Sequence, residues 1–324
     1  MDCLYTNGAI AVKEKSLLGE RLKRLCEGSA QEAFRQLIEY GFGAGADALS
    51  SRDYESLIAA EERATDEFIR RYAPGGAERD YLMLPRDFHN AEALVKAEYL
   101  SLDVQKMLAP EGNYAVSDLA NAVQSCDYGK IGVLGETVKQ AVALFSEEEK
   151  KPAGAEVGAL FVRGLFHALS RSCRKSKAVG AILARKADML NLLTAFRSDN
   201  ARAAEPLYVA GGKLSSKQLA YVFGDADRCE RAFERTDYSA FVKACIEARR
   251  AGLPYTQAER YAAHCEIDAL SRRRFELNGS EAFLYYVFRR RLECEDVRIL
   301  FVCLHAGMQE NEIKGRLRSL REGL

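Results

Sequence analysis

The sequence predicts an all-α protein, and three observations lead to this fold class. Long stretches consist of good helix formers, as in YESLIAAEERATDEFIRRYA, where apolar residues recur at three- and four-residue steps: Leu57, Ala60, Ala64 and Phe68. This spacing places them on one face of a helix. No stretch alternates apolar and polar residues as a half-buried strand does. The six prolines fall between the periodic segments, where helical proteins tolerate proline.

Composition narrows the class of protein further. The 324-residue chain has 47 basic and 47 acidic residues, so it lacks the excess positive charge of a general nucleic-acid binder. Its nine cysteines are scattered without a CxxC pair, which excludes a clustered zinc site and a disulfide framework. No apolar run approaches the roughly 18 residues of a membrane span, and the first residues do not resemble a signal peptide. We expect a cytoplasmic protein with reduced, mostly buried cysteines.

One pattern of polar residues recurs along the chain. An acidic residue is followed three residues later by an amide or a second acid, and in two cases by a basic residue six positions further on. The first acids of the three copies lie 101 and 105 residues apart. Repetition at a nearly fixed interval indicates a repeated supersecondary unit. We therefore predict one helical subunit, residues 1–324, with approximate repeats at 1–115, 116–220 and 221–324. The members of the pattern are Asp87, Asn90 and Lys96; Asp188, Asn191 and Arg197; and Glu293, Asp296 and Val302.

The repeated pattern favours a structural role over an active site. A catalytic site needs its reacting groups in one place, whereas these residues are distributed over three repeats. We expect each acid to lie early in its helix, near the positive end of the helix dipole. Each Asn, one turn later, would hydrogen-bond between helices and set their register.

An all-α metal-dependent enzyme built around Asp87, His89 and Glu92 is the competing hypothesis. His89 has no counterpart in the other repeats, and it lacks a ligand partner four residues later, at Ala93. The glycine-rich GFGAGADAL does not follow a strand, and GGK at 211–213 lacks the frame of a phosphate-binding loop. We expect no catalytic residue, no metal ligand and no cofactor.

A basic stripe is the most function-like surface in the sequence. Its members fall at helical spacing in RGLFHALSRSCRKSK: Arg163, His167, Arg171 and Arg174. Such a stripe is commonly a solvated face. The alternative is contact with acidic loops of a partner or with lipid headgroups at a membrane.

Three segments carry a resemblance to a known family. DFHNAEALVKAEYL, RKADMLNLLTAFRS with the following VAGGKLS, and YYVFRRRLECEDVRILFVCLHAGMQENEIKGRLRSL together resemble the C subunit of A/V-type ATPases and ATP synthases, a relative of the d subunit of eukaryotic V-ATPases. The order and spacing of the segments agree across most of the chain. The chain departs from the family at Asp296, where Asn is usual, and at Val302, where a basic residue is usual nearby.

The resemblance implies a funnel-shaped, non-catalytic subunit built from three related helical bundles. Its partners would be the central-shaft subunits and the membrane proteolipid ring, with one copy per complex. It would be attached peripherally to the membrane from the cytoplasmic side and would act as a rotor part between shaft and ring. A helical scaffold unconnected with ATPases is the alternative with the same fold.

Overall fold

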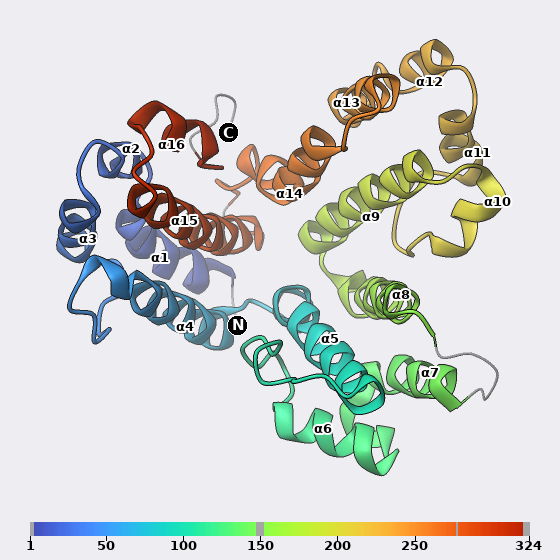
Figure 1. The fold of residues 1–324 in the computed structure, drawn as a ribbon, viewed down its shortest axis with the longest axis horizontal. Coiled ribbons are helices and arrows are strands. Elements are labelled where there is room, and N and C mark those ends of the chain that lie inside the picture. The colour runs from blue at the N-terminus through green and yellow to red at the C-terminus, as the bar shows by residue number, and fades with distance from the viewer. Residues whose placement is uncertain (1–2, 147–151, 277, 320–324) are drawn as a thin grey trace. The chain divides into compact units, whose positions relative to one another are not determined.

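The computed structural model describes residues 3–146, 152–276 and 278–319, and every regular element in these ranges is a helix (Figure 1). The all-α prediction is confirmed. No helix in the described ranges is long and apolar enough to cross a membrane. The chain divides into two compact units: Met1–Gly75 with Glu266–Leu324 form unit 1, and Gly76–Cys265 form unit 2. The division into three sequence repeats stays a prediction.

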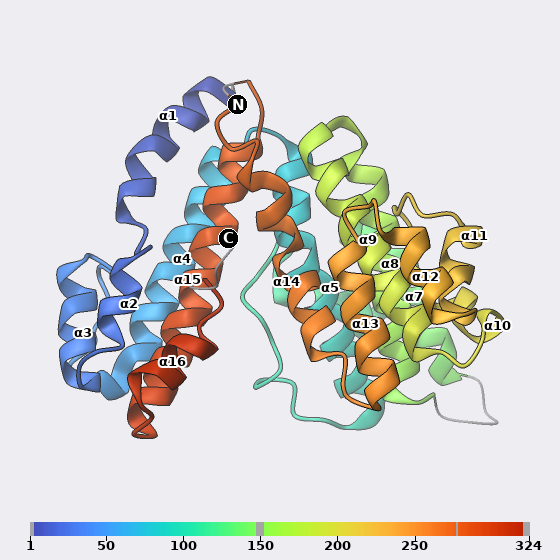
Figure 2. The same cartoon turned by 90° about the horizontal axis from the view of Figure 1, so that it is seen from above.

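Unit 1 joins the two ends of the chain around a pair of long helices, α4 and α15, which pack side by side (Figure 2). The core between them and the shorter helices includes Leu22, Leu37, Ile58, Val297 and Leu300, all fully buried. The elements are α1 (Cys3–Lys13), η1 (Glu14–Ser16), α2 (Arg21–Leu25), α3 (Ala30–Glu39), η2 (Ser51–Asp53), α4 (Tyr54–Tyr72), α15 (Glu281–His305) and α16 (Glu310–Arg316).

Unit 2 is organised around two further long helices, α5 and α9. α5 packs against α6 and α8, and α9 packs against α8 and α13. The elements are α5 (Gly76–Leu100), α6 (Val116–Ser125), η3 (Tyr128–Leu134), α7 (Gly135–Ser146), α8 (Gly154–Ser172), η4 (Cys173–Lys175), α9 (Lys177–Arg197), α10 (Ala201–Ala204), η5 (Glu205–Leu207), α11 (Ser216–Leu219), η6 (Ala220–Phe223), α12 (Ala226–Phe233) and α13 (Ser239–Ala251); α14 (Thr256–Ser271) crosses the division between the units.

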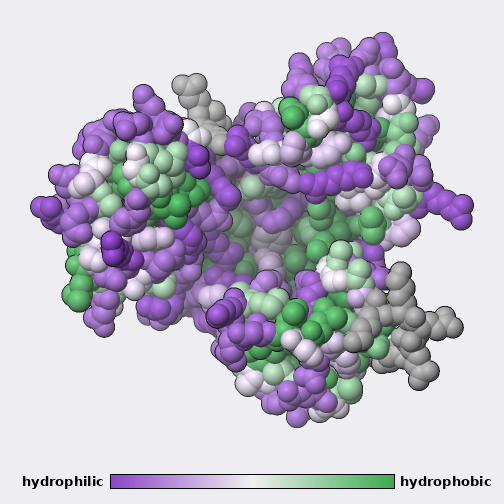
Figure 3. All heavy atoms as spheres, viewed as in Figure 1, coloured by the Kyte–Doolittle hydropathy of each residue, from purple (hydrophilic) through white to green (hydrophobic). Residues whose placement is uncertain are grey.

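Hydrophilic residues cover much of the face of each unit that Figure 3 presents, with apolar residues gathered in patches between them. The cysteines belong to the interior. Seven of the nine are buried, and none of the nine, which all lie in the described ranges, forms a disulfide. Burial raises the pKa of Cys26, Cys173 and Cys229 to about 11, so these thiols stay protonated near neutral pH.

The expectation that every proline lies between helices is wrong for Pro85. This residue lies inside α5, although an interior proline costs about 3 kcal/mol. The helix continues because both sides of Pro85 bury apolar residues, including Leu82, Leu84 and Phe88. Each such side chain contributes about 1.5–3 kcal/mol when fully buried, so packing on both sides outweighs the proline.

A buried arginine connects three parts of unit 1. Arg290 on α15 is 2% exposed, with Nε 3.1 Å from Oε1 of Glu61 on α4 and Nη1 3.2 Å from Oε2 of Glu293. Its Nη2 donates to Oγ of Ser16, just after α1, at 2.6 Å. Burial raises the pKa of Glu293, and the positive charge of Arg290 opposes that shift. The cluster therefore depends on Arg290 to compensate two carboxylates withdrawn from water.

We predict that Arg290→Met lowers the free energy of unfolding by about 3–5 kcal/mol, because it leaves buried carboxylates without their cation. Arg298→Met is the matched control on the same helix. Arg298 also pairs with a carboxylate of α4, with its Nε 2.9 Å from Oε1 of Glu55, but its side chain is 41% exposed. An exposed pair contributes about 0–1 kcal/mol. Urea unfolding followed by circular dichroism measures both free energies of unfolding. Equal losses of stability in the two variants would contradict the special role of the buried Arg290.

Candidate functional site

The first copy of the repeated pattern fixes the loop that follows α5. Asp87 is fully buried and accepts backbone N–H hydrogen bonds from Asn113 at 2.8 Å and Tyr114 at 3.1 Å. Asn90, also fully buried, donates to the carbonyl of Ala109 at 3.1 Å and accepts from its N–H at 2.8 Å. Two adjacent side chains therefore hold both ends of the loop segment 109–114 against the helix. We call this set of contacts the first clamp.

The second copy makes the same contacts from α9, and we call it the second clamp. Asp188 accepts N–H hydrogen bonds from Lys213 at 2.8 Å and Leu214 at 2.9 Å. Asn191 donates to the carbonyl of Val209 at 3.0 Å and accepts from its N–H at 2.8 Å.

The second clamp has an additional donor from the segment between α12 and α13. The hydroxyl of Tyr238 donates to the other carboxylate oxygen of Asp188, Oδ2, at 2.7 Å. Burial and this hydrogen bond raise the pKa of Tyr238, so the phenol stays protonated and remains a donor.

The third copy has a different register from the one that the sequence predicts. Asp296 on α15 accepts the backbone N–H groups of Arg318 at 2.7 Å and Ser319 at 2.8 Å, so its contacts match those of the acids in the other two clamps. Glu293 instead accepts the N–H of Gly19 at 3.0 Å and pairs with Arg290. The equivalent acid therefore lies three residues later than expected. We call the Asp296 contacts the third clamp.

A glycine precedes the two donor residues in the first and second clamps. A Cβ atom on Gly112 would lie 2.4 Å from Oδ1 of Asp87, and one on Gly212 would lie 2.4 Å from Oδ1 of Asp188. The loop backbone lies so close to each carboxylate that a side chain in place of the glycine would push the loop away from it. Sequence reasoning missed this role, although the dipeptides Gly112–Asn113 and Gly212–Lys213 are the visible signal. In the third clamp the corresponding position is Leu317, which is fully buried.

The interpretation that the acids lie early in their helices is wrong. Asp87, Asp188 and Asp296 lie in helix interiors, and each accepts loop N–H groups instead of meeting a helix N-terminus. A buried carboxylate needs such donors, because its desolvation is otherwise unfavourable. The two Asn residues likewise bond to loop backbone and not between helices.

The third members of the pattern share no contact. Lys96 pairs with Glu92 on its own helix, whereas Arg197 pairs with Glu259 and lies over the ring of Tyr255. Val302 is 54% exposed. The clamp accordingly consists of the acid, the Asn where one is present, and the loop backbone.

The residues of the competing enzyme hypothesis do not converge on one point. Asp87 bonds to the loop, Nε2 of His89 lies 2.8 Å from the carbonyl oxygen of Met107, and Glu92 pairs with Lys96. Within the described ranges, no group of three or more His, Cys, Asp or Glu side chains is arranged to hold a metal ion.

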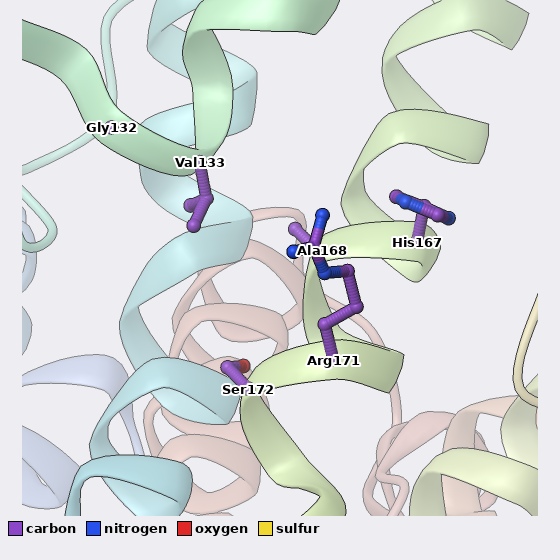
Figure 4. Close-up of a pocket in the computed structure, with 6 residues that line it drawn as sticks. All are labelled: Gly132, Val133, His167, Ala168, Arg171 and Ser172. Carbon is purple, nitrogen blue, oxygen red and sulfur yellow. The ribbon is translucent and has the colours of Figure 1, made fainter. Parts of the chain in front are cut away.

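The four residues of the basic stripe differ in their contacts and in the elements that carry them. Nη1 of Arg163 donates to the carbonyl of Pro206 at 3.0 Å. His167 and Arg171 are exposed and line a pocket of about 550 Å³ with Gly132, Val133, Ala168 and Ser172. In Figure 4 the Val133 side chain extends from η3 and the Arg171 side chain from α8 toward the space between them. Arg174 lies beyond α8, on η4, and is exposed.

Buried carboxylates on long helices thus fix loops in the described part of the chain, and one comparison says which family has this sequence pattern. The chain matches the family described as the ATP synthase (C/AC39) subunit over residues 6–316. Because the match covers nearly the whole chain, the protein belongs to this family, and the resemblance predicted from the sequence is confirmed. A search of curated proteins found no match.

We predict that Gly212→Ala destabilises the protein by about 2 kcal/mol, because the new methyl group overlaps the Asp188 carboxylate and displaces the loop. Gly180→Ala is the control on α9, the helix that carries Asp188, since its Cβ would meet nothing within 4 Å. There the substitution should stabilise by about 0.5–1 kcal/mol. Thermal and urea unfolding measure both variants. If Gly212→Ala were neutral or stabilising, the close approach would not constrain the loop.

Proposed function

We propose that this protein is a non-catalytic central-stalk subunit of an A/V-type ATPase rotor. It couples the central-shaft subunits to the membrane proteolipid ring during ATP-driven ion transport or ion-driven ATP synthesis. The family match over residues 6–316 carries the proposal. In this function the protein is present in one copy per complex and is attached peripherally on the cytoplasmic side.

The clamps support this function on mechanical grounds. A part that transmits torque must not deform where a helix passes into a loop, because a yielding loop would absorb the rotation. In the first and second clamps four hydrogen bonds fix the loop to a buried face of a long helix. In each clamp two of these bonds go to a carboxylate, and hydrogen bonds to charged groups contribute about 1.5–3 kcal/mol each. The two bonds to the Asn amide contribute about 0.5–1.5 kcal/mol each, so detaching such a loop is costly.

The exposed part of the basic stripe supplies a contact surface for the same function. Arg163 is engaged with Pro206, but His167, Arg171 and Arg174 are exposed. We propose that these three residues face the ring or the membrane around it. Charge pairing at such a surface fixes orientation more than it adds affinity.

A tagged pull-down from detergent-solubilised membranes of the source cell tests the proposed function. Recovery of the catalytic ATPase subunits together with a small, very hydrophobic ring protein is the expected result, identified by mass spectrometry. Recovery of neither, from membranes shown to contain that ATPase, would overturn the proposal and favour a scaffold unconnected with ATPases.

We predict that the double variant Arg171→Glu with Arg174→Glu weakens membrane attachment by roughly tenfold and leaves the fold intact, because it reverses charge at the stripe. Lys217→Glu with Arg235→Glu is the matched control, since both residues are exposed on unit 2 outside the stripe. The fraction of protein retained on washed membranes measures the effect. Equal retention of both variants would discard the stripe as a contact surface.

A further inference from the structure

One end of unit 1 exposes apolar side chains on its first helix. α1 is apolar around most of its circumference, yet only Thr6 and Ile10 are buried. Leu4, Tyr5 and Val12 are 54%, 60% and 69% exposed. Exposed apolar side chains gathered on one element mark a surface suited to contact with something beyond the chain.

Two other elements of unit 1 meet the beginning of α1. The ring of Tyr5 stacks on Tyr72, at the end of α4, with 6.1 Å between centroids, and Thr6 Oγ1 donates to the carbonyl of Tyr72 at 2.9 Å. Asn7 Nδ2 donates to the carbonyl of Gly279, in the loop between α14 and α15, at 3.4 Å. Figure 2 shows the start of α1 and this loop at the same end of α15.

The loop between α14 and α15 presents an aromatic ring to solvent. The side chain of Phe275 is 76% exposed. The adjacent Arg274 lies 4.7 Å from the Phe275 ring and 4.8 Å from the Tyr285 ring, and it donates to the Tyr285 hydroxyl at 2.8 Å. Contacts to α15 therefore fix the base of the loop while Phe275 points outward.

Exposed arginines neighbour these apolar groups in the chain: Arg71 precedes Tyr72, and Arg272 lies three residues before Phe275. Arg273 is compensated by Glu276 and Glu281. In the described part of the chain, Arg71, Arg272 and Arg274 form no ion pair with a carboxylate; Arg71 instead lies over the Tyr72 ring at 5.3 Å. Guanidinium groups bind phosphate through paired hydrogen bonds.

We propose that this end of unit 1, formed by Leu4, Tyr5, Arg71, Arg272 and Phe275, binds the surface of a membrane that contains anionic phospholipid. The aromatic and apolar side chains enter the headgroup region, and the arginines pair with lipid phosphates. The loop that carries Arg272 and Phe275 thus offers a cation for the phosphates and an aromatic ring for the more apolar part of the headgroup region. This lipid contact goes beyond the coupling between proteins proposed above and needs no other subunit.

Co-sedimentation of the purified full chain with protein-free vesicles tests the proposal. The probes are vesicles of phosphatidylcholine alone and of phosphatidylcholine with phosphatidylglycerol. The variant is Arg272→Glu with Phe275→Ser. The matched control is Leu49→Ser with Arg52→Glu, which changes an exposed apolar residue and an exposed arginine before the opposite end of α4. Circular dichroism and thermal unfolding verify that both variants fold.

We predict that the protein binds the anionic vesicles, that high salt weakens binding, and that the Arg272/Phe275 variant binds roughly tenfold more weakly while the control is unchanged. Failure of the unaltered protein to bind anionic vesicles, or equal binding by both variants, would overturn the proposal. A third outcome would also overturn the membrane proposal: the unaltered protein self-associates but does not bind vesicles, and the Arg272/Phe275 variant no longer self-associates. The surface would then bind a second copy of this chain. None of these results affects the pull-down of ATPase subunits, so the two proposals fail separately.

Discussion

The interaction on which the structure depends is a buried carboxylate that holds a loop to the interior of a long helix. Withdrawing an ionised carboxylate from water is costly unless hydrogen bonds replace its hydration. The replacement comes from two consecutive backbone N–H groups of the loop in each of the three clamps. In the first two clamps the held loop leads directly into the next helix, α6 or α11. One acid therefore fixes the start of the next helix, α6 or α11, to the interior of the long helix.

Buried charge has a second structural role in unit 1, where an arginine joins α4, α15 and the segment after α1. Buried ionic groups of this kind contribute little net stability compared with apolar packing, but removing one partner is costly. They make alternative arrangements of the helices unfavourable. For a subunit proposed to transmit torque, resistance to rearrangement matters more than a large free energy of unfolding.

The sequence contained enough information for the helices and for the existence of a repeated polar pattern, because both depend on local spacing. It did not contain the loop backbone partners of these acids and amides, which lie 18 to 27 residues away without periodicity, nor Tyr238, 50 residues from Asp188. Local spacing alone therefore predicts the acids at helix starts and equates Glu293, instead of Asp296, with Asp87 and Asp188. Local rules predict a helix end at Pro85, whereas burial of apolar residues on both sides of it keeps α5 continuous. The role of Gly112 and Gly212 depends on their distance from a carboxylate more than 20 residues away, which local sequence rules do not contain.

Whether this chain rotates within the assembled ATPase distinguishes the proposed rotor subunit from a stationary one. A thiol-reactive probe is attached to Cys126, which is exposed on unit 2. The catalytic ATPase subunits, which form the head of the proposed complex, are held on a surface. For a rotor subunit, we expect the probe to turn relative to the head when ATP is supplied and to stop when ATP is withdrawn. A probe that stays fixed to the head during measured ATP hydrolysis would place the protein in the stator and contradict the account.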